Sequence, residues 1–134
     1  QRVKKEVSVL ILGIGIDIVK IERMRNACHR RTPHFVEKIY TKREIEYCYS
    51  KKEPFSDLSA RFAAKEALLK AFGIGWGRGI SWTDMEIVED GLGAPKLNFF
   101  GSLEEKAREM GIKEAMLSLS HTGDYAVAVV VLLG

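Results

Sequence analysis

Two apolar segments near the ends of the chain limit what it can fold into. Residues 9–18 and Tyr125–Leu133 consist almost wholly of aliphatic side chains and glycine. Neither segment is long enough to cross a bilayer as a helix, which takes roughly 20 apolar residues. Their β-branched content favours buried strands. We therefore expect one strand near each end of the chain, the second buried on both faces, and no membrane partner.

Helix signals occupy much of the interval between these strands. N-capping residues, apolar faces and closing glycines mark where the helices begin and end. The predicted helices cover residues 20–29, a segment from Thr32-Pro33 to Tyr40, a segment that starts at a Thr41–Glu44 capping box, a long segment from Ser56 or Asp57 to Phe72, and a segment from a Ser102 cap to Gly111.

Alternating apolar and polar residues predict the remaining strands. Residues 82–89 and 96–100 flank a glycine-containing turn, and residues 117–120 lead through a turn at 121–124 into the closing strand. This order of elements indicates an α+β fold, with a mainly antiparallel sheet packed against helices and one long central helix. We expect a single domain over residues 1–134, with residues 1–8 as an N-terminal tail.

Composition narrows the function classes. The chain has 134 residues, a hydrophobic fraction of 46% and a formal net charge of +3. Its two cysteines have no zinc-site spacing, so we expect free thiols in a reducing, cytoplasmic setting. Between Lys20 and Arg31 five Lys or Arg side chains accompany one acid. Such a block has three interpretations: a solvated helix face, a docking site for an acidic partner, or a nucleic-acid contact. No pattern of stacking aromatics supports nucleic acid.

Two carboxylates are candidates for chemistry. Asp17 lies at the end of the first apolar strand, and Glu66 lies within the long helix, one turn before Lys70. Taken singly, Asp17 is better explained as a cap for the next helix. Glu66 is better explained as one half of a Glu–Lys pair, worth about 0.3–0.5 kcal/mol. Taken together, the two carboxylates suit a magnesium ion, and the surrounding Arg61, Lys65, Lys70 and His121 suit a polyphosphate ligand.

Turn and loop residues are candidates for phosphate binding. His121 and Thr122 lie at the last hairpin turn, and Gly75 lies in the glycine-rich segment 73–79. Imidazole, hydroxyl and backbone amide groups can all hold a phosphate. An exposed turn and a flexible connector are the alternative interpretations, and the spacing alone does not decide between them.

Three motifs carry a family resemblance. They are GIGIDIV at residues 13–19, RFAAKEALLKAFG at 61–73, and SLSHT at 118–122 followed by YAVA at 125–128. In their order and spacing the chain resembles the short bacterial holo-acyl-carrier-protein synthases over about residues 11–133. The resemblance implies a 4′-phosphopantetheinyl transferase fold. It implies an Mg²⁺-dependent enzyme that transfers 4′-phosphopantetheine from coenzyme A to a serine of apo acyl carrier protein. This reaction releases 3′,5′-ADP and supports fatty acid biosynthesis in the cytoplasm. It also implies a homotrimer with active sites at the subunit clefts.

The resemblance implies a catalytic role for three residues. Asp17 and Glu66 match the two magnesium ligands, and Lys70 matches a lysine near the pyrophosphate. Either Glu66 or a metal-bound water takes the proton of the carrier serine. The chain departs from the family pattern at Lys20, where family members often have an acid three residues after the strand Asp. Glu22 is the nearest replacement for that acid.

The resemblance also implies where coenzyme A binds. Arg61, His121 and Thr122 match residues that hold its 3′-phosphate and adenosine end. We add Lys65 as a neighbouring cation and Gly75 as a loop residue able to wrap phosphates.

Two arginines match a docking site for the carrier protein. Arg23 and Arg30, in the basic segment, match arginines that bind its acidic helix. Two alternative functions stay open. One is a transferase that also serves the carrier domains of polyketide or peptide synthetases, and the other is a small basic nucleic-acid-binding module.

Overall fold

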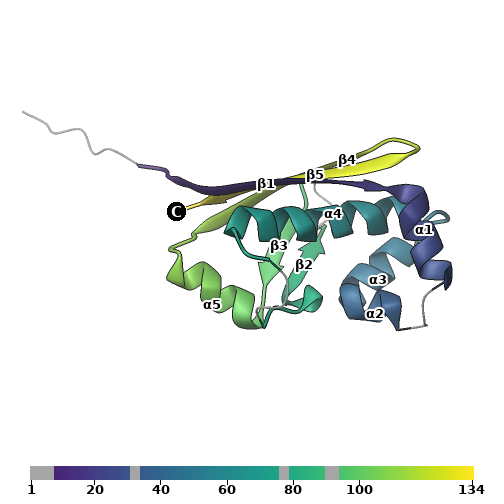
Figure 1. The fold of residues 1–134 in the computed structure, drawn as a ribbon, viewed down its shortest axis with the longest axis horizontal. Helices are drawn as coiled ribbons and strands as arrows, with labels where there is room; N and C mark the ends of the chain where they lie inside the picture. The colour runs from purple at the N-terminus through teal and green to yellow at the C-terminus, as the bar shows by residue number, and fades with distance from the viewer. Residues whose placement is uncertain (1–7, 31–33, 76–78, 90–93) are drawn as a thin grey trace, which may run out of the picture.

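The protein is described here by a computed structural model. The structure describes residues 8–30, 34–75, 79–89 and 94–134. It is the expected α+β fold, with one long helix, α4, running beneath a sheet (Figure 1). The elements in chain order are β1 (Ile11–Lys20), α1 (Ile21–Arg30), α2 (Phe35–Ile39), α3 (Lys42–Tyr49), α4 (Phe55–Phe72), the 3₁₀ helix η1 (Trp82–Asp84), β2 (Met85–Val88), β3 (Lys96–Phe99), α5 (Gly101–Glu109), β4 (Glu114–His121) and β5 (Tyr125–Leu133).

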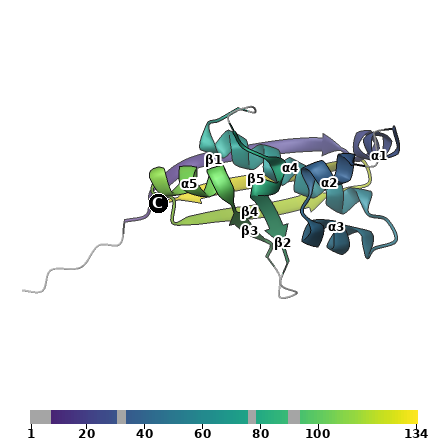
Figure 2. The same ribbon diagram turned by 90° about the horizontal axis from the view of Figure 1, so that it is seen from below.

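The strands form two antiparallel sheets among the described residues. The larger sheet has the order β1-β5-β4, which places the closing strand in its centre, and the smaller is the β2–β3 hairpin. The helices and the β2–β3 hairpin all lie on one side of the larger sheet (Figures 1 and 2). The expected antiparallel pairing is therefore confirmed, and the sheet is a single-sided layer.

Two glycines let β1 lie directly on α4. A Cβ atom at Gly13 would overlap the carbonyl oxygen of Ala71, and one at Gly15 would overlap that of Ala67. Two strand residues advance about 6.6 Å and four helix residues about 6 Å, so β1 and α4 stay in step. The next β1 residue on this face, Asp17, is therefore level with Ala63, one turn further toward the N-terminus of α4.

The opposite face of the larger sheet is bare, and it is apolar along β1 and β5. The register aligns Ile14 with Val131, Ile16 with Val129 and Ile18 with Val127. The three isoleucines are 60–66% exposed, whereas the alternate β5 residues, from Ala126 to Leu132, are buried against the helices. The prediction that the closing strand is buried on both faces is therefore wrong for the single chain, because helices cover one face only.

Local signals placed some helix ends correctly and others wrongly. The Thr41–Glu44 capping box is present in both directions, and Gly73 closes α4 with a φ of 72°. However, α4 begins at Phe55, before the predicted caps, because the Glu53 carboxylate accepts the amides of Phe55 and Ser56 at 2.9 and 3.1 Å.

Two further predictions differ from the structure. The strand expected over 82–89 is shorter, because Trp82–Asp84 forms a 3₁₀ turn with Asp84 bonded back to the amide of Ser81. The helix α5 starts at Gly101, so Ser102 lies inside it and does not cap it. The start expected at Thr32-Pro33 and the tail over residues 1–7 lie outside the described residues.

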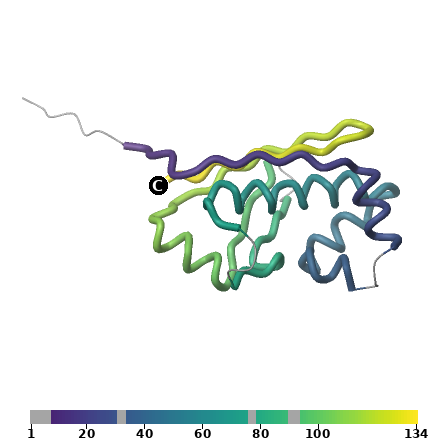
Figure 3. The backbone as a smooth tube through the Cα atoms, in the orientation of Figure 1, coloured from purple at the N-terminus to yellow at the C-terminus, as the bar shows by residue number. Residues whose placement is uncertain are grey.

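The two ends of the described chain lie beside each other. Leu10 and Gly134 exchange backbone hydrogen bonds of 3.2 and 2.9 Å, and β1 and β5 run side by side along the molecule (Figure 3). Within the described residues, no helix is both long enough and apolar enough to cross a membrane.

Candidate active site on two sides of one helix

One side of α4 brings Asp17 and Lys70 together. The Lys70 ammonium lies 3.1 Å from Asp17 Oδ1 and donates to the Ile16 carbonyl at 3.0 Å. The Lys70 side chain is 56% exposed and that of Asp17 is 19% exposed. The lysine is thus a solvated cation beside a largely sheltered carboxylate, an arrangement open to a phosphate ligand.

Glu66 lies on the same side of α4, one turn before Lys70. Side chains four apart share a helix face, and they lean toward the helix N-terminus. Glu66 therefore leans toward the level of Ala63, which is also the level of Asp17. Two carboxylates, with phosphate and water completing the shell, are a donor set that magnesium commonly accepts. No cluster of three or more His, Cys, Asp or Glu occurs within the described residues.

The opposite side of α4 carries Arg61. Nine residues separate Arg61 from Lys70, and at about 100° per residue they point roughly 180° apart. The Arg61 side chain is 1% exposed and lies 3.8 Å from Glu89. Its guanidinium stacks 4.5 Å from the Tyr47 ring centre. Its Nε and Nη1 are buried and have no hydrogen-bond partner among the described residues, and Arg61 is one of the residues that line a small pocket of about 120 Å³.

Lys65 lies on the Arg61 side and is completely buried. Its ammonium donates to Glu44 at 2.6 Å, to the Ile39 carbonyl at 2.7 Å and to the Trp82 carbonyl at 3.2 Å. An ammonium has three hydrogens, so these internal acceptors use all of them. Burial lowers the pKa of Lys65, and the Glu44 carboxylate partly offsets that effect.

The helix α1 forms a polar groove at the end of the sheet where β1 stops. The groove has a volume of about 420 Å³. Arg23 and Arg30 are both exposed and lie along it, seven residues apart and hence on one stripe. Lys20 and Glu22 also line it. Three cations therefore face one carboxylate, which suits an acidic partner.

The β4–β5 turn lies at the same end of the sheet. His121 ends β4 and is exposed. The Thr122 hydroxyl accepts the amides of Asp124 and Tyr125 at 3.3 and 3.4 Å. The Asp124 carbonyl accepts the first amide of α1 at 2.9 Å. Gly75 is at the other end of α4, just beyond its C-terminus, and is exposed. The structure therefore does not join these three residues to Arg61 within one chain.

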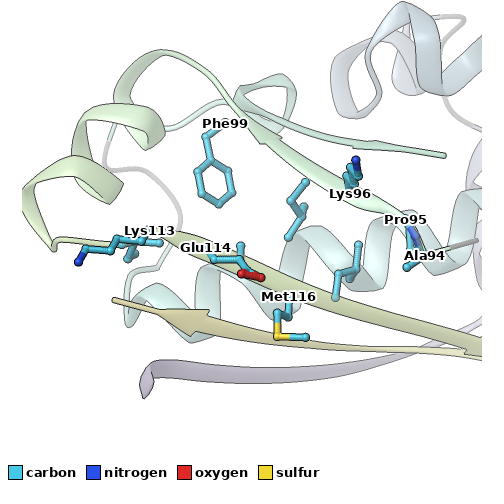
Figure 4. A pocket seen from close by; sticks show the side chains of 11 residues that line it. Ala94, Pro95, Lys96, Phe99, Lys113, Glu114 and Met116 are labelled. Carbon is cyan, nitrogen blue, oxygen red and sulfur yellow. The ribbon is translucent and has the colours of Figure 1, made fainter. Parts of the chain in front are cut away.

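A second groove lies away from all of these residues. It has a volume of about 530 Å³ and runs between β3 and β4, with Phe99 and Met116 among its lining side chains (Figure 4). No predicted site residue lines it, so it is not part of the candidate active site.

Comparison with known proteins identifies the family. The family model of the 4'-phosphopantetheinyl transferase superfamily matches residues 13–130. The chain belongs to this superfamily. Among curated relatives, the holo-[acyl-carrier-protein] synthase of Geobacter sp. (strain M21) is 46% identical over 92% of this chain and 98% of its own length. That of Caldanaerobacter subterraneus subsp. tengcongensis is 42% identical over 90% and 94%.

Solved structures agree with the superfamily assignment. The holo-[acyl-carrier-protein] synthase of Neisseria meningitidis superposes with a TM-score of 0.84 at 34% identity, over 92% of this chain and 98% of that chain. The synthase of Helicobacter pylori, solved in complex with coenzyme A, has a TM-score of 0.77 at 35% identity, over 89% and 98%.

Sequence reasoning missed two residues beside the Arg61 guanidinium in this phosphopantetheinyl transferase. Tyr47 stacks on it, and Glu89 both approaches it and accepts the Tyr47 hydroxyl at 2.8 Å. Neither residue belongs to a motif, and they lie 14 and 28 positions from Arg61 in the sequence. The only local signal was the aromatic side chain of Tyr47 in a short amphipathic helix.

Proposed function

We propose that this chain is a holo-[acyl-carrier-protein] synthase. It transfers 4′-phosphopantetheine from coenzyme A to a serine of apo acyl carrier protein, for fatty acid biosynthesis in the cytoplasm. The observation that carries the proposal is the contact between Asp17 and Lys70 on the solvated side of α4, the helix face that also carries Glu66 one turn before Lys70. The curated relatives named above are 42–46% identical over 90–92% of this chain, which supports the same activity here.

The proposed reaction needs an attacking oxygen, a proton acceptor and a stabilised leaving group. The serine oxygen forms a bond to the phosphorus attached to pantetheine, and the bond from that phosphorus to 3′,5′-ADP breaks. The serine proton goes to the Glu66 carboxylate or to a water beside it. Lys70 moves from Asp17 to the pyrophosphate, where its ammonium stabilises the charge that builds on the leaving group.

The two carboxylates fit a magnesium ion. Asp17 and Glu66 would hold it, since both are hard oxygen donors on the side of α4 that also carries a phosphate-binding lysine. When bound, the ion would neutralise part of the pyrophosphate charge. Replacing Mg²⁺ with EDTA in the assay tests whether the enzyme requires the ion. The replacement should abolish transfer while leaving the far-ultraviolet circular dichroism of the protein unchanged.

Two protomers would supply one coenzyme site. Asp17 and Arg61 lie on opposite sides of α4, so one coenzyme molecule bound at both would have to bridge neighbouring chains. The bare apolar face that carries Ile14, Ile16 and Ile18 is the kind of surface that buries itself in an oligomer. A homotrimer packed through this face is our proposal for the assembly.

Mixing two impaired variants tests the shared site. At low coenzyme A, Asp17→Ala alone should be inactive and Arg61→Met alone should be weak. Co-expressed in equal amounts, they should recover roughly a quarter of wild-type activity, because random association leaves about one interface in four with both intact surfaces. If no activity returns in mixed oligomers of confirmed composition, each protomer must hold a complete site.

The α1 groove is proposed to bind the carrier protein. Arg23→Glu together with Arg30→Glu should raise the KM for carrier about tenfold, lower its salt dependence, and leave the KM for coenzyme A unchanged. Arg108→Glu with Lys113→Glu, which reverses exposed charges away from α1, is the matched control. An unaltered carrier KM in the Arg23/Arg30 variant would reject the docking site.

The activity itself has a direct assay. The protein, Mg²⁺, coenzyme A and an apo acyl carrier protein should yield a carrier whose mass has increased by one phosphopantetheine group. Carrier domains from polyketide and peptide synthetases, tested in parallel, define its range. A carrier mass that stays unchanged with every substrate would refute the proposed function.

A further inference from the structure

A buried ion pair joins α4 to the layer of elements beneath it. Lys65 and Glu44 are both almost inaccessible to solvent, with exposures of 0% and 1%. Beyond its bond to Lys65, Glu44 accepts the Thr41 amide at 2.9 Å and the Ile87 amide at 3.0 Å. Through these bonds and the two carbonyls that Lys65 contacts, the pair connects α4 with α2, α3, η1 and β2.

The same elements build the pocket around Arg61. Arg61 lies one turn before Lys65 on α4, Tyr47 comes from α3, and Glu89 directly follows β2. The contacts of Arg61 with Tyr47 and Glu89 are therefore set by how α3 and β2 sit against α4. Lys65 and Glu44 are the buried charged residues that bridge these three elements next to the pocket.

The energetics point to a positioning role for this pair. A buried ion pair contributes little net stability, because the attraction mainly offsets the cost of desolvating both charges. Removing one partner is costly, since it leaves a charge buried and unpaired. Such a pair therefore selects one geometry strongly. The geometry it selects here is that of the small pocket lined by Arg61, two of whose buried nitrogens have no hydrogen-bond partner among the described residues.

We propose that Lys65 and Glu44 are positioning residues that hold α3 and β2 in the geometry that lets Arg61 discriminate coenzyme A from its 3′-dephospho form. The proposal rests on the proposed function, in which Arg61 binds the 3′-phosphate. Lys65 itself touches no ligand, because its three hydrogens are used inside the protein.

The central test compares coenzyme A with 3′-dephospho-coenzyme A as donor. In the wild type, kcat/KM should favour coenzyme A, and Arg61→Met should remove most of that preference. The double variant Lys65→Met/Glu44→Gln removes both charges of the pair, and the oxygen of the introduced side-chain amide can still accept the Ile87 amide. This double variant should fold and keep its kcat at saturating coenzyme A. Its preference for coenzyme A over the 3′-dephospho form should fall about tenfold, through a higher KM for coenzyme A.

Two comparisons separate positioning from general destabilisation. Leu103→Ala opens a cavity under α5, where the side chain is 0% exposed and outside the network, so it lowers stability but should leave the donor preference at the wild-type value. Glu44→Asp keeps the charges and shortens the link by one methylene, so it should lower the preference less than the double variant does. If the double variant fails to fold, the donor preference of Glu44→Asp is compared with that of Leu103→Ala, and this comparison tests the positioning role.

The outcomes distinguish the two proposals. A wild-type preference retained in the folded double variant, or in Glu44→Asp if the double variant does not fold, overturns the positioning role. A wild-type enzyme that transfers from both donors equally overturns the assignment of Arg61 to the 3′-phosphate. A wild-type protein that transfers from neither donor refutes the proposed function itself.

Discussion

The two sides of α4 carry similar residues in opposite surroundings. On one side Lys70 is 56% exposed and paired with Asp17 across a solvated edge. On the other side Lys65 is 0% exposed and paired with Glu44 in the interior. Both pairs join a lysine to a carboxylate distant in the sequence. The solvated lysine can exchange its partner for a phosphate, whereas the buried one cannot without exposing an unpaired charge.

The largest expected effect comes from the solvated side. Asp17→Ala should lower kcat by about a thousandfold while the protein stays folded, because the proposed magnesium ligand and the partner of Lys70 are both lost. Steady-state kinetics and thermal unfolding measure the two effects. Glu105→Ala, which removes an exposed acid of α5, is the control. Full activity in Asp17→Ala would exclude a metal-binding role.

The next effect tests whether the two sides act across subunits. Ile16→Lys introduces a charge at a position that is 60% exposed in the protomer, so it should leave the protomer folded and dissociate the proposed trimer. Light scattering should show the lower mass of the dissociated protein. If the coenzyme bridges two chains, activity should fall about a hundredfold together with this dissociation. A monomeric variant with full activity would show that one chain contains the whole site.

A smaller effect tests the contact that brings Asp17 to α4. Gly15→Ala places a Cβ atom on the Ala67 carbonyl, so β1 must move away from the helix. We expect a loss of about 1–3 kcal/mol in the free energy of unfolding, with reduced activity because Asp17 moves as well. Gly123→Ala, where a Cβ would have nothing within 4 Å, is the control. Equal stabilities of the two variants would contradict the close packing of β1 on α4.

The smallest effect concerns the start of α4. Glu53→Gln should lower the free energy of unfolding by about 0.5–1 kcal/mol at pH 7 through a weakened cap. Burial tends to raise the pKa of Glu53, but its hydrogen bonds to Ser56 and Phe55 outweigh that effect and lower it below 4.5. The stability it contributes is present above pH 4.5 and is lost as pH falls through the lower folded-state pKa. The gap between wild type and variant in urea titrations should therefore close toward pH 3.

Several parts of the fold could be predicted from local pattern. The Thr41–Glu44 capping box and the helix end at Gly73 depend only on residues close together in the sequence, and both predictions are confirmed. Predictions failed where a more distant or competing partner decided the outcome. Glu53 accepts the amides of Phe55 and Ser56, so α4 begins before the caps expected at Ser56 or Asp57.

The amino-acid sequence alone determined the superfamily, the order of the elements and the identity of the charged residues on the long helix, since these follow from motifs and periodicity. Only the tertiary structure decided which charges are buried. The burial of Lys65 depends on Ile39, Glu44 and Trp82, which approach it from three other elements. Desolvation is set by everything packed around a group in space, and no window of sequence contains those neighbours.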